Sequence, residues 1–365
     1  MGAMEALTCQ IGAAATDVRV GPGALSGIGE HLRGSAAGGH VLVVTDDHVG
    51  PRYGDTVTRS LADAGLAASV WSMPAGEPSK CLAQAATLYQ VLCDRGVGRD
   101  GVVLALGGGV VSDLAGYVAA TWMRGVALAI CPTTVEAAID ASIGGKTAVN
   151  LPAGKNLVGA FHPAVLVVVD PACFATLSAR DVRAGLAESM KHAILSSASF
   201  VAWHEARVDA ILGLDADTLT ELVVRNIRFK AEVVAEDPYE RLGRRAVLNF
   251  GHTFGHAIEA RAGYALRHGE CVAIGMVAAC RLSAALGLLD ADVVDRVARL
   301  IAAFGLPTAV AAPLEVDDVW ATMTHDKKKA RGRLRFVVLD GIGRPAIRDD
   351  VPRDQARAAL ASVLA

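Results

Sequence analysis

The sequence predicts an α/β fold with two domains: a Rossmann-like parallel-sheet domain, followed by a mainly α-helical domain. Three observations predict it. The chain has 365 residues, which is more than one hydrophobic core usually serves. Its first half alternates short apolar runs with helical segments, as buried strands of a parallel sheet do. From about Ser178 long helical periodicity takes over, so we expect domains at 1–177 and 178–365.

Five apolar runs mark the expected strands of the first domain. They cover 41–44, 68–71, 101–106, 127–130 and 165–170. Helical segments such as 81–95 separate them, which is typical of a doubly wound, nucleotide-binding sheet. Helical periodicity in the second domain predicts helices at 182–195, 216–236, 244–261, 269–286 and 291–304.

Composition and charge exclude several classes of function. The formal net charge is -3, so the chain has no basic field for nucleic acid. Its seven cysteines are scattered and never form a Cys-x-x-Cys motif, which favours reduced thiols in the cytoplasm. We find no membrane-spanning apolar stretch and no export signal in the sequence. Any anionic ligand must therefore be held by local charges.

Three histidines lie close together in the second domain. His252 and His256 are four residues apart, on one face of an expected helix, and His268 follows twelve residues later. Imidazole is a common zinc ligand, so this spacing favours a metal site. The same spacing also arises from core or capping histidines, and both interpretations are open at this point.

Two glycine-rich segments and one charged pair add further candidates. Gly107-Gly108-Gly109 lies between an expected strand and an expected helix, where a diphosphate can approach backbone amides; a tight turn is the alternative. The stretch 140–156 carries two lysines and two asparagines that suit a phosphate, although a surface loop has a similar composition. Glu188 and Lys191 share one helix face, as ordinary surface pairs also do.

In this order, the motifs resemble those of the sugar phosphate cyclase family, and most closely its dehydroquinate synthase branch. The matching stretches are 107–116, 132–134, 140–156, 159–162, 184–191, 248–256, 268–270 and 326–328. The similarity runs from Asp46 to the strand-like segment 334–339. Glu136 departs from the family, which usually has an apolar residue there, and its role is open.

The resemblance implies a role for each matching residue. The implied zinc ligands are Glu188, His252 and His268, which leaves His256 to the substrate. The implied NAD contacts are Asp46, Glu77, Lys80, Gly108, Gly109, Asp113, Thr133, Thr134, Lys155 and Thr176. The implied substrate contacts are Asp140, Lys146, Asn156, Lys191, Lys230, Arg245, Asn249 and His256, with Lys327 or Lys328. Arg124 matches an arginine that the family contributes across a homodimer interface.

The implied activity is that of a cytoplasmic, homodimeric lyase of the shikimate pathway. It would use NAD and zinc, or cobalt as a substitute, to turn 3-deoxy-D-arabino-heptulosonate 7-phosphate into 3-dehydroquinate and phosphate. Lys230 and Arg245 match positions that bind a carboxylate, which favours an acid substrate. A cyclase of secondary metabolism, such as an amino-dehydroquinate synthase, is one alternative. A metal-dependent polyol or glycerol phosphate dehydrogenase is another.

Overall fold

The computed structural model describes residues 4–35, 39–263, 265–311, 314–328 and 334–364, with backbone alone at 325–328. Clustering of its contacts divides the chain into two compact units. The first unit comprises residues 1–177 and 214–239, and the second comprises 178–213 and 240–365. Within the described residues, no helix has the length and apolar character needed to cross a membrane.

A seven-stranded sheet forms the centre of the first unit, in the order β1-β2-β9-β6-β5-β3-β4. Its parallel core consists of β3 (Val41–Asp46), β4 (Ala68–Met73), β5 (Val102–Gly107), β6 (Ala127–Pro132) and β9 (Leu166–Val169). These strands confirm the five that were predicted from the apolar runs. Residues 41–44 and 102–106 are fully buried, which explains why their sequences are continuously hydrophobic.

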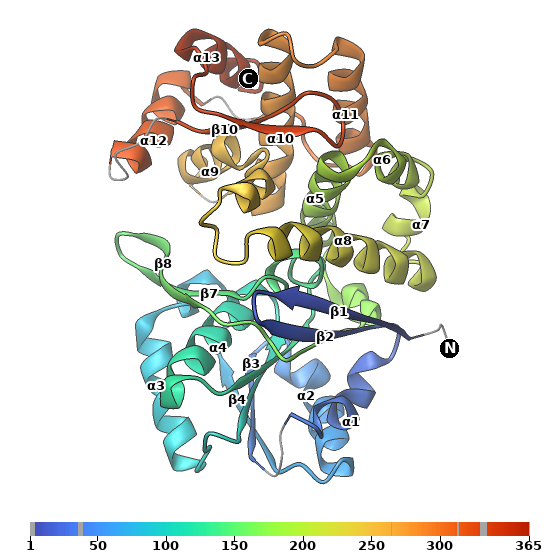
Figure 1. Ribbon diagram of the computed structural model, residues 1–365, viewed down its shortest axis with the longest axis vertical. Helices are drawn as coiled ribbons and strands as arrows, with labels where there is room; N and C mark the ends of the chain where they lie inside the picture. The colour runs from blue at the N-terminus through green and yellow to red at the C-terminus, as the bar shows by residue number, and fades with distance from the viewer. Residues whose placement is uncertain (1–3, 36–38, 264, 312–313, 329–333, 365) are drawn as a thin grey trace. The chain divides into compact units, whose positions relative to one another are not determined.

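Helices flank both faces of this sheet (Figure 1). Helices α1 (Ile28–Leu32) and α2 (Gly50–Asp63) lie on one side of the strands, and α3 (Leu82–Asp94) and α4 (Gly109–Thr121) lie on the other. Two hairpins also belong to this unit. One is β1 (Glu5–Ile11) with β2 (Ala14–Val20), and the other is β7 (Lys146–Leu151) with β8 (Gly154–Phe161).

The second unit is mainly helical, as predicted. It contains α5 (Ala179–Ser196), α6 (Ala198–Glu205), α7 (Val208–Leu212), α9 (His252–Arg261), α10 (His268–Ala285), α11 (Ala291–Ala303), α12 (Val316–Lys328), α13 (Arg353–Ala361), and the short hairpin of β10 (Phe336–Leu339) and β11 (Pro345–Arg348). Helix α10 is buried over nearly its whole length and packs against both α5 and α9. It is the central helix of this unit.

Glycines allow α10 to approach its two neighbours closely. A Cβ atom on Gly269 would lie 1.9 Å from the carbonyl oxygen of Ala184 in α5. A Cβ atom on Gly275 would lie 2.1 Å from the carbonyl oxygen of Gly251, which precedes α9. Both distances are far below van der Waals contact, so any larger residue would force the helices apart. This packing places the starts of α9 and α10 beside α5.

The division into units differs from the contiguous domains expected from the sequence. Helix α8 (Ala216–Glu236) belongs to the first unit, where it packs against β1 and the π-helical turn Ala137–Ala141. Helical periodicity locates a helix but does not say which element its apolar face covers. The expected helix 244–261 is also interrupted. A 3₁₀ helix (Arg244–Asn249) precedes α9, and Gly251 between them has a left-handed φ of 80°.

Candidate functional site

Glu188 and Lys191 form a buried ion pair on α5 in the second unit. Their side chains are 1% and 2% exposed, and the Lys191 ammonium contacts Oε2 of Glu188. Burial alone would raise the pKa of Glu188, but attraction to Lys191 and then to His252 outweighs it and holds this pKa well below 4.5. Glu188 is therefore an ionised carboxylate inside the protein, which makes it a strong ligand for a cation.

His252 and His268 turn the same ring atom toward this carboxylate. Nε2 of His252 lies 3.4 Å from Oε1 of Glu188, and Nε2 of His268 lies 3.6 Å from that oxygen. The other ring nitrogens face protein acceptors. Nδ1 of His252 lies 3.1 Å from the carbonyl oxygen of Phe250, and Nδ1 of His268 lies 3.0 Å from Oε2 of Glu259. Both imidazoles thus present Nε2 to one point.

His256 joins this group from the next turn of α9. Its ring centroid is 5.1 Å from that of His252 and 5.6 Å from that of His268. Desolvation by the surrounding side chains, followed by repulsion from the imidazoles of His252 and His268, lowers the pKa of His256 to about 4 although the residue as a whole is exposed, and the ring is neutral at pH 7. One nitrogen of each of the three histidines lies within 4.8 Å of the others.

The donor atoms fit a divalent transition metal. Two imidazole nitrogens and one carboxylate are a common protein ligand set for catalytic zinc, and cobalt accepts similar ligands. The three histidines form one candidate set of ligands, and the Glu188 carboxylate lies 3.4 and 3.6 Å from two of them, His252 and His268. The set predicted from the sequence is the one with Glu188, whose negative charge favours a cation.

An ion-pair network fixes the start of α10, where His268 is the first residue. Arg180 of α5 donates two hydrogen bonds of 2.7 Å to the Glu270 carboxylate. Glu270 also accepts the backbone N–H of Arg267 at 2.9 Å, and the Arg267 side chain lies 2.9 Å from Asp181. These bonds connect the α10 N-terminus to α5, which carries Glu188.

The predicted nucleotide contacts of the first unit gather at the carboxyl ends of three strands. Asp46 ends β3 and accepts the backbone N–H groups of His48 and Val49 at 2.9 and 2.8 Å. Gly108 and Gly109 follow β5 and begin α4, and Thr133 and Thr134 follow β6. The chain order reverses between β3 and β5, and nucleotides bind open α/β sheets at such a reversal.

A Cβ atom on Gly108 would lie 3.1 Å from the Thr134 side chain, so a larger residue would crowd this turn. Thr133 is buried, and its N–H donates to the Gly107 carbonyl at 3.0 Å. The turn is therefore compact and offers the amides of the α4 N-terminus to an anion.

A second cluster surrounds Lys80, which is only 5% exposed. Its ammonium lies 3.1 Å from Glu77 and 3.0 Å from Asp113. Burial raises the pKa of Asp113 although Lys80 opposes it. Burial also acts to raise the pKa of Glu77, but hydrogen bonding to Asn150 and attraction to Lys80 and Lys155 lower it overall.

Thr176 lies at the end of a 3₁₀ helix (Pro171–Thr176), where its hydroxyl is 2.9 Å from that of Tyr53. The Thr176 side chain hydrogen-bonds to Tyr53 and to the carbonyl oxygen of Cys173, neither of which is a predicted NAD contact.

The predicted substrate residues are distributed over both units. Lys230 of α8 is buried, and its ammonium contacts Asp140 in the first unit. Lys146 begins β7, Asn156 lies on β8 with φ 57°, and both are exposed. In the second unit Arg245 is buried and Asn249 is exposed, and both lie in the 3₁₀ helix before α9.

Three further predicted residues lie after α4 and at the end of α12. Arg124 is exposed and follows α4, with φ 70°, next to Met123 with φ 48°. Lys327 and Lys328 end α12, but their side chains lie outside the described residues.

Two residues at these sites were missed in the sequence. Asn150 donates a hydrogen bond of 2.7 Å to Glu77 and accepts the N–H of Asn156 at 2.9 Å. Glu259 contacts His268. Asn150 was not singled out, because the stretch 140–156 was interpreted as one phosphate-binding segment. Glu259 lies seven residues after His252 and three after His256, so helical spacing places it on the same helix face and could have identified it.

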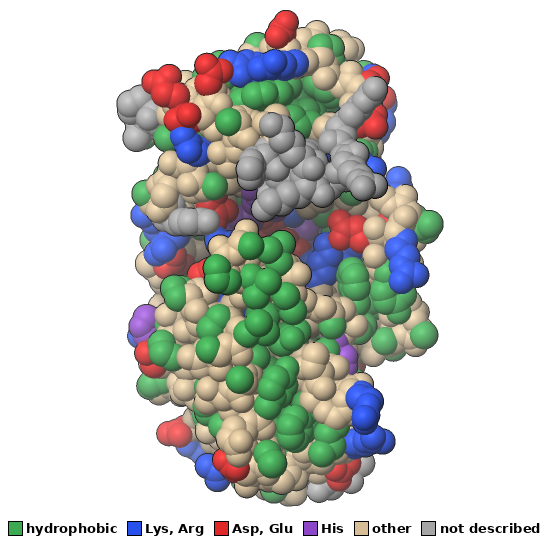
Figure 2. Space-filling model, turned by 90° about the vertical axis from the view of Figure 1, so that its left-hand side faces the viewer, with side chains coloured by type: hydrophobic (Ala, Val, Ile, Leu, Met, Phe, Trp, Pro, Cys, Tyr) green, Lys and Arg blue, Asp and Glu red, His purple; other side chains and the backbone are tan. Residues whose placement is uncertain are grey.

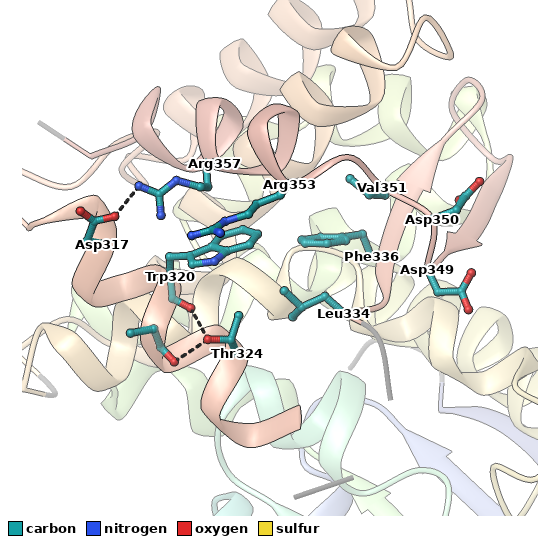
Figure 3. Close-up of a pocket in the computed structure, with 11 residues that line it drawn as sticks. Asp317, Trp320, Thr324, Leu334, Phe336, Asp349, Asp350, Val351, Arg353 and Arg357 are labelled. Carbon is teal, nitrogen blue, oxygen red and sulfur yellow. Dashed lines mark hydrogen bonds and ion pairs between the residues drawn. The ribbon is translucent and has the colours of Figure 1, made fainter. Parts of the chain in front are cut away.

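A surface pocket of about 760 Å³ lies elsewhere in the second unit, between α12, α13 and β10 (Figure 3). Trp320 and Phe336 line it, and the Arg357 guanidinium lies 5.8 Å from the Trp320 ring centroid while it contacts Asp317. None of the predicted metal, NAD or substrate residues within the described side chains lines this pocket.

Hydrophobic side chains gather on one face of the first unit (Figure 2). The exposed large apolar residues of this unit include Leu157 and Phe161 of β8, at 58% and 42% exposure, and Met123, at 42%. Strand β8 is an edge strand of the β7–β8 hairpin, and most of its residues are exposed. Exposed apolar surface along a strand edge is typical of a protein interface.

Comparison with known proteins gives one consistent result. The 3-dehydroquinate synthase N-terminal model matches residues 70–184, and the C-terminal model matches residues 185–329. A 3-dehydroquinate synthase of Desulforamulus reducens is 43% identical over 358 residues, which cover 98% of this chain and 99% of that protein.

Solved structures agree on the fold. One match is the structure of 2-deoxy-scyllo-inosose synthase complexed with carbaglucose-6-phosphate, NAD+ and Co2+. The aligned residues cover 99% of this chain and 100% of that chain, with a TM-score of 0.90 and 24% sequence identity. The 2-epi-5-epi-valiolone synthase of Streptomyces hygroscopicus, with NAD+ and Zn2+ bound, matches 97% of this chain and 98% of its own with a TM-score of 0.86, at 29% identity.

Proposed function

The chain belongs to the 3-dehydroquinate synthase family, and we therefore propose that it is a phosphate-eliminating cyclase dependent on NAD and a divalent metal. The proposed substrate is 3-deoxy-D-arabino-heptulosonate 7-phosphate, and the products are 3-dehydroquinate and phosphate. The observation that carries this proposal is the convergence of His252 and His268 on the buried Glu188 carboxylate, beside Lys191.

When bound, the two cofactors would supply the chemistry that side chains cannot, namely acidification of a substrate hydroxyl by the metal and reversible hydride transfer by NAD. The proposed ligands of the metal are Glu188, His252 and His268. The proposed NAD contacts are the strand-end residues Asp46, Gly108, Gly109, Asp113, Thr133 and Thr134, with Glu77, Lys80, Lys155 and Thr176.

The chain's own residues would handle protons and anions. The neutral ring of His256 can accept a proton or a hydrogen bond from a substrate hydroxyl or phosphate. Lysines and asparagines suit the phosphate, and the proposed contacts are Lys146, Lys191, Asn156 and Asn249, with Lys327 or Lys328. Arg245 and Lys230 are buried cations whose charge suits a carboxylate, which favours an acid substrate over a neutral sugar phosphate.

The test is to incubate the zinc-loaded protein with catalytic NAD and the heptulosonate phosphate, and to measure phosphate, dehydroquinate and NADH together. A cyclase releases phosphate and carbocycle in equal amounts without net NADH, because the hydride is returned. Continuous accumulation of NADH would instead identify a polyol or glycerol phosphate dehydrogenase and overturn the proposal.

The branch of the family is tested in parallel with two other substrates. An amino-dehydroquinate synthase should prefer the amino analogue of the acid substrate. A cyclase without a carboxylate site should prefer sedoheptulose 7-phosphate. Preference for the heptulosonate phosphate over both, in kcat/KM, is the expected result.

We also propose that the enzyme is a homodimer to which Arg124 contributes across the interface. The exposed apolar residues Leu157 and Phe161 of β8 and Met123, next to Arg124, support it. Arg124→Ala and His268→Ala should each inactivate the enzyme. Equal coexpression should restore about a quarter of the wild-type activity in total, because about half of the dimers are mixed and each mixed dimer has one intact site of two. No recovery, with mixed dimers demonstrated by differential tags, would exclude a shared site.

A cytoplasmic location is proposed from the cysteines. All seven lie in the described residues, and none of them forms a disulfide. Burial raises the pKa of Cys280 to about 12, so this thiol is protonated and unreactive. Such a set suits a reducing compartment.

A further inference from the structure

Glu259 is a buried carboxylate of α9 that has no role in the proposed function. It is 8% exposed, and its Oε2 lies 3.0 Å from Nδ1 of His268 on α10. The contact is between side chains on two different helices, and both helices belong to the second unit. A buried carboxylate at this distance accepts a hydrogen bond from the imidazole N–H.

Such a hydrogen bond decides which tautomer His268 adopts. A neutral imidazole carries one proton, so an N–H at Nδ1 leaves the lone pair on Nε2. In His268, Nε2 is the atom that lies 3.6 Å from Oε1 of Glu188. His252 has the same arrangement, with Nδ1 beside the Phe250 carbonyl and Nε2 toward Glu188. A carbonyl oxygen can only accept, which fixes the His252 tautomer independently.

We propose that Glu259 is a positioning residue that holds His268 in its Nδ1–H form, so that Nε2 binds the divalent metal. The inference rests on the proposed function only in assuming that His268 is a metal ligand. Carboxylates that hold a ligand histidine in this way raise its basicity, and their loss weakens metal binding about 10- to 100-fold.

The experiment measures metal affinity without any assay of activity. The apo-proteins of wild type, Glu259→Ala, Glu259→Gln, His268→Ala and Glu205→Gln are titrated with Zn2+ against a chromophoric chelator, and with Co2+ while its visible absorption is recorded. Glu259→Ala should bind Zn2+ about 10- to 100-fold more weakly and show an altered Co2+ spectrum. Glu259→Gln keeps an acceptor oxygen, so its loss of affinity should be smaller.

Glu205→Gln is the matched control. Glu205 is also a glutamate of the second unit and is also held by a strong polar contact, its pair with Arg296 at 2.8 Å, but it contacts none of the three histidines. Its Zn2+ affinity and Co2+ spectrum should equal those of wild type. If both Glu259 variants also retain the wild-type affinity and spectrum, the proposed role of Glu259 is overturned.

Two further results separate this inference from the proposed function. If His268→Ala binds metal as tightly as wild type, the assignment of His268 as a metal ligand is wrong, and the role of Glu259 is overturned with it. The wild-type apo-protein, labelled with ¹⁵N-histidine, tests the tautomer without any variant that must fold. His268 should show a protonated Nδ1 and an unprotonated Nε2; the opposite tautomer would overturn the role given to Glu259.

Discussion

At the scale of single residues, Glu188 and Lys191 stand out because two opposite charges are almost completely buried on one helix. Removing two charges from water costs several kcal/mol, and their mutual attraction returns only part of that cost. A pair of apolar residues would usually stabilise the helix packing as well or better. The pair is therefore better explained by what it binds than by stability.

Arg245 is a second buried charge, at 3% exposure. Arg245→Ala is expected to raise the KM for the acid substrate at least about 30-fold, since losing one partner of a buried charge pair costs about 2 kcal/mol or more. Arg245→Lys keeps the charge without the planar fork and should recover part of the loss. The control is Arg244→Ala, which removes the exposed neighbour. An unchanged KM in Arg245→Ala would exclude a carboxylate contact.

The sequence predicted which residue types gather at the candidate metal site, but not which neighbouring side chains hold them in place. The spacing of His252 and His256 placed two imidazoles on one face of α9, and the structure confirms that they lie together. Spacing could not show that Nδ1 of His268 meets Glu259, because that contact depends on how α9 and α10 pack. Partners on different helices leave no periodic signal in the sequence.

At the scale of elements, the contact between α9 and α10 depends on the absence of a side chain at Gly275. Gly275→Ala would place a Cβ atom 2.1 Å from the Gly251 carbonyl oxygen, so we expect a loss of about 1–3 kcal/mol in the free energy of unfolding and weaker zinc binding. Gly54→Ala is the matched control, because Gly54 is also helical but has open space around its Cα. That control should be neutral or stabilised by up to about 1 kcal/mol.

Chemical denaturation of both variants measures the difference. Equal unfolding free energies for Gly275→Ala and Gly54→Ala would show that the helices adjust without cost, and the close packing would then not explain the site geometry.

The ion pair between Glu205 of α6 and Arg296 of α11 gives a prediction about pH. Hydrogen bonding to Arg296 lowers the pKa of Glu205 below 4.5, so its contribution to stability is present above pH 4.5 and is lost as pH falls through the lowered pKa. Glu205→Gln should lower the wild-type unfolding temperature slightly at pH 7. The difference should shrink as the pH is lowered from 4.5 toward 3. A difference that persists unchanged at pH 3 would contradict this account.

Strands were predicted correctly where every residue along the strand is buried, and less often where buried and exposed residues are mixed. Strands β3 and β5 are buried on both faces, and their apolar runs located them. Strands β1 and β2 have mixed burial and contain no comparable apolar run, so this hairpin was not predicted. The break at Gly251 was missed because the apolar spacing continues across it.

At the scale of the whole molecule, a metal that binds only the folded chain should stabilise it. Removing zinc with a chelator is expected to lower the unfolding temperature, because a ligand at a hundred times its Kd contributes about 2.7 kcal/mol. His268→Ala should unfold at the same temperature with and without the chelator. A similar decrease in both proteins would mean that the chelator acts elsewhere.

Helix α8 belongs to the first unit although it follows part of the second unit in the chain, and this limits how the protein can be divided into fragments. The chain passes between the units at 177/178, at 213/214 and at 239/240, so no single cut yields two complete bodies. A fragment ending at residue 177 would lack the helix that packs on β1 and carries Lys230. A cut at 184/185, where the two family models meet, would sever α5 before Glu188. Each unit is therefore complete only when both of its separate chain segments are present.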